Sequence, residues 1–389
     1  MSGHFAVALI FISLGAFIIP FLARRVRIPV AAAEILFGFF LTLVGPGHKM
    51  VTMEWFEVLS EIGFITLMFL AGLEIDLAEL WQHGKQKLAL GVRFFLGALV
   101  TSLVAGMLIG LHPFVALALA LIAAGIVLPT LKEHGVGENR MEELMVIALM
   151  GEFLSIMVLT LVDLSAKAND WTEVLIHLGG VGAVVAVTLV LLVGGRLMVW
   201  WFPEPHEKLM LAPDPMEVGI RAALALMFFM AGLAILLGIE AILGAFLAGV
   251  IFASVFKERT ELEEKLSGWA YGFLIPLFFM SVGMRFDLAQ LDTDTILGLM
   301  PPLIGILVLN RLAGAMALPH RQPWRERATG AVLLSAPLTL WVVSASIGEH
   351  TGLIDTGSAD ALILLALLTS IVAPTLFRRW EPRVGHHGG

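Results

Sequence analysis

The sequence predicts an all-α polytopic membrane protein with about 13 transmembrane helices. Hydrophobic residues make up 59% of the 389 residues and charged residues only 14%, whereas a soluble protein carries about 25% charged residues. The mean hydropathy is +0.93, and apolar segments follow one another along the chain, which leaves almost no room for a soluble domain. The chain contains no cysteine, so disulfides, zinc–thiolate sites and thiol catalysis are excluded.

The apolar segments are long enough to cross, or nearly cross, a hydrocarbon core of about 30 Å. No basic stretch precedes Phe5, and the first segment leads straight into a basic cluster, so we expect a retained helix and not a cleaved signal peptide. In chain order the predicted segments are 4–23, 30–45, 55–73, 86–111, 113–131, 141–164, 172–199, 216–237, 239–256, 268–284, 296–318, 325–348 and 359–378.

Lysine and arginine residues predict the orientation of the segments. If the N-terminus lies outside, 18 of the 24 basic residues fall in inside loops and three in outside loops. The remaining three, Arg93, Arg221 and Arg311, lie within or near segments. Because cytoplasmic loops are enriched in Lys and Arg, we expect an outside N-terminus and a cytoplasmic C-terminus.

An internal repeat relates the two halves of the chain. GLEIDLAEL at 72–80 and GMRFDLAQL at 283–291 agree at five of nine positions and close the third and tenth segments, at a constant offset of 211 in residue number. The copies lie seven segments apart, an odd number, so they lie on opposite sides of the membrane, as in the inverted repeats of secondary transporters. The predicted domains are a first repeat at 1–164, a linker helix and cytoplasmic loop at 165–215, a second repeat at 216–378 and a short tail at 379–389.

Two segments carry helix breakers at positions that this offset makes equivalent. AAGIVLPT contains Gly125 and Pro129, and LLSAPLT contains Pro337, which the offset aligns with Ile126. Proline removes a backbone donor, and paired interrupted helices mark the binding site of inverted-repeat transporters. We therefore predict two broken helices whose freed carbonyls near Gly125 and Pro337 face a cavity, water or a cation. An ordinary proline kink is the alternative.

Glu152 is the one ionisable residue in the apolar run from Val146 to Leu161. A carboxylate near the bilayer centre costs about 2.5–3.5 kcal/mol on insertion scales, so such a residue is a functional candidate by default. The alternative is a neutral Glu hydrogen-bonded between helices. Ser155 lies on the same helix face, where it could donate to the carboxylate or offer an oxygen to a cation.

Further candidates surround these positions. Hydroxyl oxygens near the breaks are possible cation ligands, since hard cations prefer oxygen, although such hydroxyls often bond their own backbone. They belong to Thr130, Ser335 and Thr339. Arg311 lies deep in the eleventh segment and stays protonated. It is predicted to compensate negative charge, either of Glu152 or of a broken-helix C-terminus, with Asn310 as a polar partner. Snorkelling towards the cytoplasm is the alternative.

Two acidic residues follow the third segment at its predicted cytoplasmic end. Glu74 and Asp76 are candidates for an entrance funnel that concentrates cations. Helix capping and solvation are equally good explanations. No histidine spacing indicates a metal site, so we expect no metal beyond a transported monovalent cation.

These features together resemble the monovalent cation:proton antiporter superfamily, in the branch that holds bacterial Na⁺/H⁺ exchangers and the membrane domain of Kef potassium efflux systems. The resemblance rests on the thirteen segments, FLAGLEIDL at 69–77, the broken helix ending in LKEHGV at 131–136, the charged site in the next helix and the basic residue in segment 11. It implies crossing broken helices and a homodimer. Gly151 and Glu152 stand where the family usually has a polar residue followed by Asp, and Ile122 and Ala123 stand where it tends to have Thr-Ser.

The resemblance implies exchange of Na⁺ or K⁺ for H⁺ across a prokaryotic inner membrane. Glu152 would bind the two ligands alternately, and with one such group we expect electroneutral exchange. We expect no enzyme activity, no cofactor and no nucleic-acid partner. The alternatives are transport of another small solute by the same fold, such as an organic anion, and a non-transporting membrane sensor or scaffold.

Overall fold

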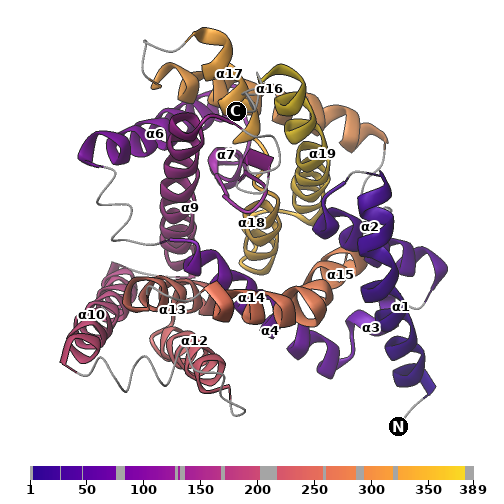
Figure 1. Cartoon of the computed structure of the whole chain (residues 1–389). Coiled ribbons are helices and arrows are strands. Elements are labelled where there is room, and N and C mark those ends of the chain that lie inside the picture. The colour runs from indigo at the N-terminus through magenta and orange to yellow at the C-terminus, as the bar shows by residue number, and fades with distance from the viewer. Residues whose placement is uncertain are drawn as a thin grey trace, which may run out of the picture. The chain divides into compact units, whose positions relative to one another are not determined.

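The computed structural model describes most of the chain, and the described part is helical, without a strand (Figure 1). In a membrane the backbone must satisfy its own hydrogen bonds, and helices do so within each segment. The described residues are 3–26, 28–45, 47–75, 84–127, 130–131, 136–167, 171–201, 217–256, 260–285, 293–318 and 323–381.

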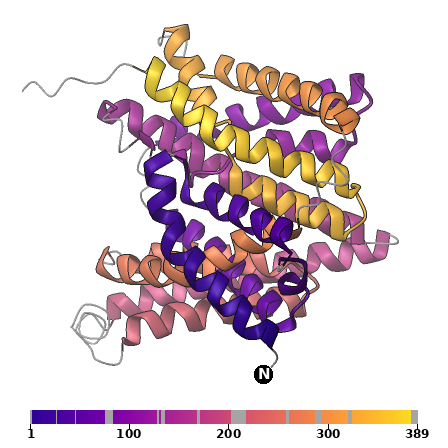
Figure 2. The same ribbon diagram turned by 90° about the vertical axis from the view of Figure 1, so that its right-hand side faces the viewer.

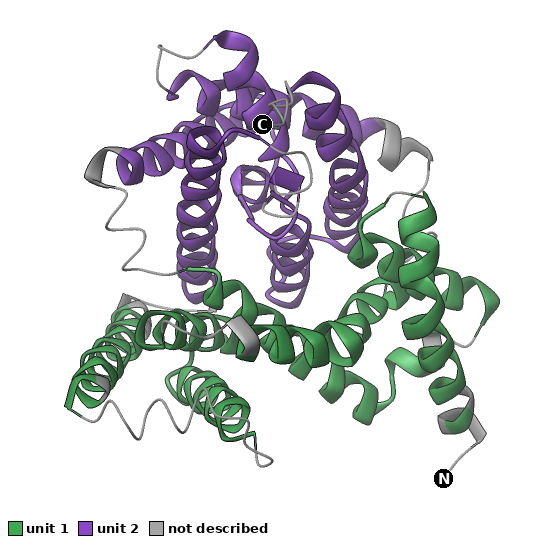
Figure 3. Cartoon of the chain, viewed as in Figure 1, with its two compact units in different colours: residues 1–79, 168–285 green, residues 80–167, 286–389 purple. Residues whose placement is uncertain are grey.

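The helices form two compact units (Figure 3). Unit 1 combines Met1–Glu79 with Ala168–Arg285, and unit 2 combines Leu80–Lys167 with Phe286–Gly389. The helices of unit 1 are α1 (Gly3–Val26), α2 (Val30–Val44), α3 (Gly47–Val51), α4 (Glu54–Leu73), α10 (Trp171–Trp201), α12 (Val218–Leu236), α13 (Ala241–Val255), α14 (Thr260–Trp269), the π-helical turn η1 (Ala270–Leu274) and α15 (Ile275–Arg285). The helices of unit 2 are α6 (Gly84–Leu108), α7 (Pro113–Ala120), α9 (Glu138–Lys167), α16 (Thr293–Met316), α17 (Trp324–Leu333), α18 (Leu338–His350) and α19 (Thr356–Trp380).

The described residues contain nine helical stretches long and apolar enough to cross a membrane. A tenth is reached if α17 and α18, which bend by 50° at their break, count as one span. The apolar helices α2 and α13 have 15 residues each and are shorter than that criterion. The all-helical membrane fold is thus confirmed, whereas the number of thirteen helices stays a prediction. The predicted tenth segment also begins earlier than expected, because α14 starts at Thr260.

Helix boundaries repeat along the chain with the offset predicted from the sequence repeat. α2 begins at Val30 and α13 at Ala241, and both helices have 15 residues. In unit 2, α7 begins at Pro113 and α17 at Trp324. Each unit contains segments from both predicted repeats, the first three with the eighth to tenth in unit 1 and the fourth to sixth with the last three in unit 2. The division of the chain into two repeats stays a prediction. Two repeats related by this offset should have helices that begin at matching positions, as these helices do.

Two helix crossings in unit 1 follow the same relation. α2 packs against α15, and α4 packs against α13. A Cβ atom added to Gly38 would overlap the carbonyl oxygen of Met280, and one added to Gly249 would overlap that of Phe69. The offset of 211 relates the two contacts. It places Gly249 at the position of Gly38, and Met280 at the position of Phe69. Only glycine lets these backbones approach so closely.

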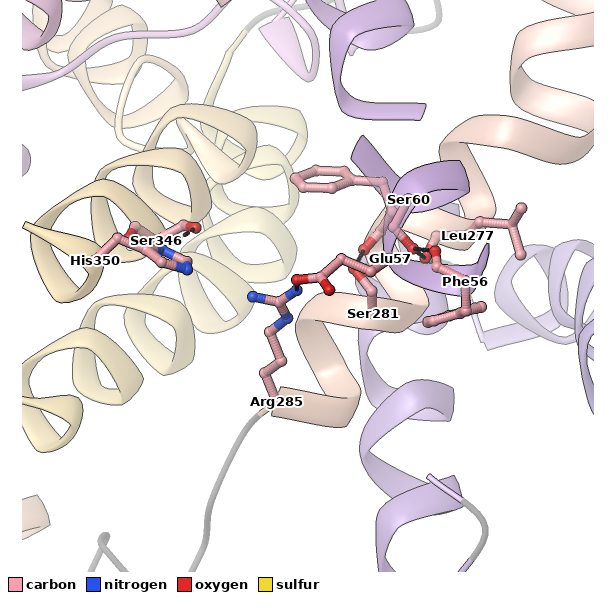
Figure 4. Close-up of polar contacts among 9 residues, drawn as sticks. Phe56, Glu57, Ser60, Leu277, Ser281, Arg285, Ser346 and His350 are labelled. Carbon is pink, nitrogen blue, oxygen red and sulfur yellow. Dashed lines mark hydrogen bonds and ion pairs between the residues drawn. The ribbon is translucent and has the colours of Figure 1, made fainter. Parts of the chain in front are cut away.

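A polar seam joins α4 to α15 in unit 1 (Figure 4). Nη2 of Arg285, at the end of α15, lies 3.2 Å from Oε1 of Glu57 in the first turn of α4. One turn further along α4, the Ser60 hydroxyl donates to its own helix at 2.8 Å and to the Leu277 carbonyl at 3.4 Å. The ion pair is exposed and the serine buried, so the buried end of the seam has no net charge.

In unit 2, α18 lies along α19 and also contacts α7 and α9 (Figures 1 and 2). α16 packs against α6 and against the short helix α7. The interrupted helix α7 is therefore surrounded by α6, α16 and α18, and its end lies where side chains from several helices can reach it.

Candidate functional site

The short helix α7 ends at Ala120, in the buried interior of unit 2. His112 precedes it as the N-cap, with its side chain accepting from the N–H of Phe114, and Pro113 begins it. At Leu121 the backbone becomes extended, with φ −59° and ψ 150°. The chain then has no regular helix until Val127. The break leaves the last carbonyls of α7 and the next N–H groups without their helical partners.

The freed carbonyls are bonded by side chains from α16 and α18. The Trp341 indole Nε1 donates to the Ala118 carbonyl at 2.6 Å. Nδ2 of Asn310 donates to the Leu119 carbonyl at 3.0 Å. The Arg311 guanidinium donates to the Leu121 carbonyl at 2.7 Å and to those of Leu119 and Ala120 at 3.4 Å. The negative end of α7 thereby receives one full positive charge.

The freed N–H groups are bonded by α9 instead. The N–H of Ile122 donates to Oγ of Ser155 at 2.9 Å, and that of Ala124 donates to Oε2 of Glu152 at 3.1 Å. Alternate N–H groups point to one side because this backbone is extended. Residues 121–124 therefore lie between a carboxylate-bearing helix and an arginine-bearing helix, and the side chains replace the helical bonds that the break removes.

Glu152 is 2% exposed and Arg311 is 3% exposed. Each lies in the interior of a membrane helix, where an ionisable group is expensive unless it is bonded. The N–H of Ala124 stabilises the ionised carboxylate, because hydrogen bonds to a charged group are stronger than neutral ones. The guanidinium donates to carbonyls at the end of α7, which is the contact that the second of its two predicted roles requires.

The absence of a side chain at Gly151 lets α9 bring Glu152 close to the broken segment that follows α7. A Cβ atom at Gly151 would lie 2.9 Å from Cβ, Cγ2 and Cδ1 of Ile122. The Ile122 side chain thus fills the space beside the glycine, and the broken segment packs directly on α9. Gly151 and Ile122 stand at positions where the family that the sequence resembles usually carries polar residues. In this chain the two residues form an apolar contact.

The other predicted hydroxyls bond their own helices. Ser155 donates to the Gly151 carbonyl at 2.6 Å and not to the Glu152 carboxylate. Thr130 donates to the Ile126 carbonyl at 2.7 Å, and Ser335 to the Ala331 carbonyl at 3.0 Å. Of these, Ser155 alone also bonds the broken segment, so it is the hydroxyl nearest in role to Glu152.

The second break lies between α17 and α18. Pro337 is the buried N-cap of α18, and half-buried Thr339 lies in its first turn. Gly125 is exposed, with open space where a Cβ would be. In unit 1, Glu74 is the exposed C-cap of α4. Pro129 and Asp76 lie outside the described residues.

Sequence reasoning missed Trp341. This residue is completely buried and supplies one of the bonds that hold the end of α7. A signal was present, since a tryptophan one helical turn after Pro337 in an apolar segment needs an acceptor for its N–H. The contact between Gly151 and Ile122 was also missed, because no pattern in the sequence shows that two positions so far apart in the chain touch.

Comparison with known proteins identifies the family. The family model described as "Sodium/hydrogen exchanger, transmembrane" matches residues 11–380. The chain belongs to the sodium/hydrogen exchanger family. This confirms the resemblance drawn from the sequence.

Relatives of this chain are named as antiporters. It is 31% identical to the putative Na⁺/H⁺ antiporter YjbQ of Bacillus subtilis, over 98% of this chain and 64% of that protein. The exchanger therefore spans just under two thirds of YjbQ. It is 27% identical to the Na⁺/H⁺-K⁺ antiporter GerN of Bacillus cereus, over 92% of this chain and 91% of GerN. These names denote transporters, in agreement with the expectation that the chain is not an enzyme.

A solved structure shows the same fold. The sodium proton antiporter MjNhaP1 of Methanocaldococcus jannaschii superposes with a TM-score of 0.64 at 16% identity, over 97% of both chains. At this identity the likeness establishes the antiporter-like fold of the exchanger.

Proposed function

We propose that this exchanger swaps Na⁺ or K⁺ for H⁺ across a prokaryotic inner membrane, with Glu152 as the shared binding group. The observation that carries this proposal is the bond from the Ala124 N–H to a buried Glu152 carboxylate at the broken helix. A carboxylate buried there must be neutralised by a proton, a cation or a donor.

Exchange follows from competition for one carboxylate. Protonated Glu152 releases its proton to one side and takes a cation, and a conformational change exposes it to the other side, where the steps reverse. The backbone N–H of Ala124 holds Oε2 in place in the ionised state. The hydroxyl of Ser155 and the carbonyls of the broken segment supply oxygen, the ligand that monovalent cations prefer.

The fixed charge of Arg311 stays with the end of α7 throughout this cycle, since guanidinium does not deprotonate in proteins. Glu152 is the carboxylate bonded to the broken segment, so one proton is exchanged for one monovalent cation. The proposed cycle is therefore electroneutral.

We also propose a homodimer, an outside N-terminus and a cytoplasmic C-terminus. The two inverted repeats at 1–164 and 216–378 belong to the same proposal. Their support is the single offset shared by helix boundaries and by the glycine contacts of Gly38 and Gly249. Orientation rests on the distribution of Lys and Arg.

The test is exchange in proteoliposomes that contain a pH-sensitive dye. Adding Na⁺ or K⁺ outside should change the internal pH with wild-type protein and not with Glu152→Gln. Glu61→Gln, at an exposed position on α4, is the matched control and should behave as wild type. If neither cation changes the internal pH with wild-type protein, the exchange proposal fails and the non-transporting alternative stands. An active Glu152→Gln variant would remove Glu152 from the mechanism.

Electroneutrality is tested in the same vesicles. An imposed membrane potential should leave the exchange rate unchanged. A clear acceleration or slowing would mean that net charge moves in each cycle.

A further inference from the structure

Glu34 is a buried carboxyl that the proposed exchange cycle does not use. It lies in the second turn of the apolar helix α2 in unit 1 and is 3% exposed. Among the described residues it has no hydrogen-bond donor and no ion-pair partner. Ionisable groups inside membrane helices are functional candidates by default, because a bare carboxylate is costly to bury.

The charged groups on the helices packed against α2 lie elsewhere. These helices are α1, α3 and α15. Arg24 and Arg25 are exposed in the last turn of α1, and Lys49 is exposed on α3. Arg285 on α15 forms its ion pair with Glu57. The side chains of His4 and His48 on α1 and α3 lie outside the described set.

The other half of the chain shows that the crossing does not need this carboxyl. The offset of 211 places Ala245 of α13 at the position of Glu34. Ala245 is fully buried, and the crossing of α13 with α4 has the same glycine contact as that of α2 with α15. An alanine therefore packs this type of crossing, so packing alone gives no reason for a glutamate.

We propose that Glu34 is a second proton-binding site, separate from Glu152 and located in unit 1. A proton needs only the carboxyl itself, whereas a metal cation needs several oxygen ligands. No group of three or more His, Cys, Asp or Glu side chains that could hold a metal ion occurs in the described part of the chain. Glu34 follows the basic end of α1, which the proposed orientation puts at the cytoplasmic side, so it would take protons from there.

Infrared spectroscopy tests the site without relying on transport. Exposed carboxyls are ionised above about pH 6, so a protonated carboxyl C=O stretch that persists above that pH reports buried groups. Other carboxyls, such as Asp163 and Asp360, are also buried, so we expect such a band in Glu152→Gln and a smaller band in the double variant Glu152→Gln/Glu34→Ala. The control Glu152→Gln/Glu61→Gln should keep the band. Glu34→Ala copies the residue at the matched crossing, and Glu34→Gln replaces it if the alanine variant unfolds.

Two results would overturn the proposal. The first is a band of unchanged size when Glu34 is replaced by Ala or Gln. The second is disappearance, when saturating Na⁺ is added to Glu152→Gln, of the part of the band that depends on Glu34, which would make Glu34 a metal-cation site. Because the spectra are recorded in a Glu152→Gln background, failure of the exchange proposal leaves this test intact.

Discussion

The backbone N–H of Ala124 donates to Oε2 of Glu152 across 3.1 Å, although the two residues are 28 positions apart in the chain. The candidate ion site and the break in the helix are thus bonded directly to each other. A substitution that moves the broken segment should therefore alter Glu152 even when the carboxyl itself is intact.

Gly151→Ala should destabilise the protein and weaken the proposed exchange. The new Cβ would lie 2.9 Å from three carbons of Ile122, and overpacking of this kind costs about 1–3 kcal/mol. Thermal unfolding in detergent gives the stability change. Adding Ile122→Ala removes two of the three close carbons and should recover part of the loss. Additive effects of the two substitutions would show that they do not touch.

Arg311→Met should lower thermal stability strongly, because it leaves the carbonyls of Ala120 and Leu121 without their side-chain donor. Each unsatisfied buried acceptor costs about 1–3 kcal/mol. Arg311→Lys keeps the charge but loses the planar fork, so it should be intermediate. Arg93→Met, at an exposed position on α6, is the control with little expected effect. Equal stability of the two methionine variants would mean that Arg311 only snorkels.

Trp341→Phe keeps the aromatic ring and removes the N–H that bonds the Ala118 carbonyl. Because both groups are fully buried, we expect a loss of about 1–3 kcal/mol and altered cation dependence of exchange. Trp380→Phe is the control, since Trp380 is exposed at the end of α19. Wild-type stability of Trp341→Phe would show that the bond contributes nothing.

Gly38→Ala and Gly249→Ala should have closely similar effects. In each case the new Cβ would overlap a carbonyl oxygen of the crossing helix, so the helices must separate, at about 1–3 kcal/mol. Gly182→Ala, where no atom lies within 4 Å of the added Cβ, is the control. Thermal unfolding of the three variants is the measurement. A tolerated alanine at one glycine and a severe loss at the other would contradict the repeat.

Asp355→Ala should loosen the first turn of α19 at neutral pH and not in acid. Asp355 is the N-cap, and its hydrogen bond from the Ser358 hydroxyl is the main cause that lowers its pKa below the ordinary value of 3.8. A pKa lowered by folding means that ionised Asp355 stabilises the folded state. The stabilisation is present above about pH 4 and is lost as pH falls through the lower folded value.

Hydrogen–deuterium exchange of the amides at 356–359 measures this effect. Exchange in Asp355→Ala should be faster than in wild type at pH 7, in line with about 1 kcal/mol for a lost N-cap, and equal to it in strong acid. Asp355→Asn should resemble wild type, because Asn is also a good N-cap. A difference that persists unchanged in acid would mean that the charge has no part in it.

Much of the site could be predicted because membrane burial makes polar residues conspicuous. Glu152, Arg311 and Asn310 stood out as polar groups in apolar segments, and the structure places all three around one broken helix. Trp341 was missed although its indole N–H needs an acceptor in an apolar segment, because the sequence does not show which carbonyl accepts the bond. Ser155 was found by its helical spacing from Glu152, but the direction of its hydrogen bonds depends on another helix.

The sequence by itself determined the membrane class, the order of the apolar segments, the offset of 211 between the repeated motifs and two of the buried ionisable groups, Glu152 and Arg311. Hydropathy and spacing are local properties of the chain, so they need no folded partner. Only the tertiary structure decided where helices break and which atoms meet. Pro301 and Pro302 lie inside the continuous helix α16, whereas α7 ends at Ala120, five residues before Gly125, the next glycine or proline in its segment. A helix can end inside a membrane only where other groups replace its lost hydrogen bonds, and Arg311, Trp341, Ser155 and Glu152 reach Ala118–Ala124 from three other helices.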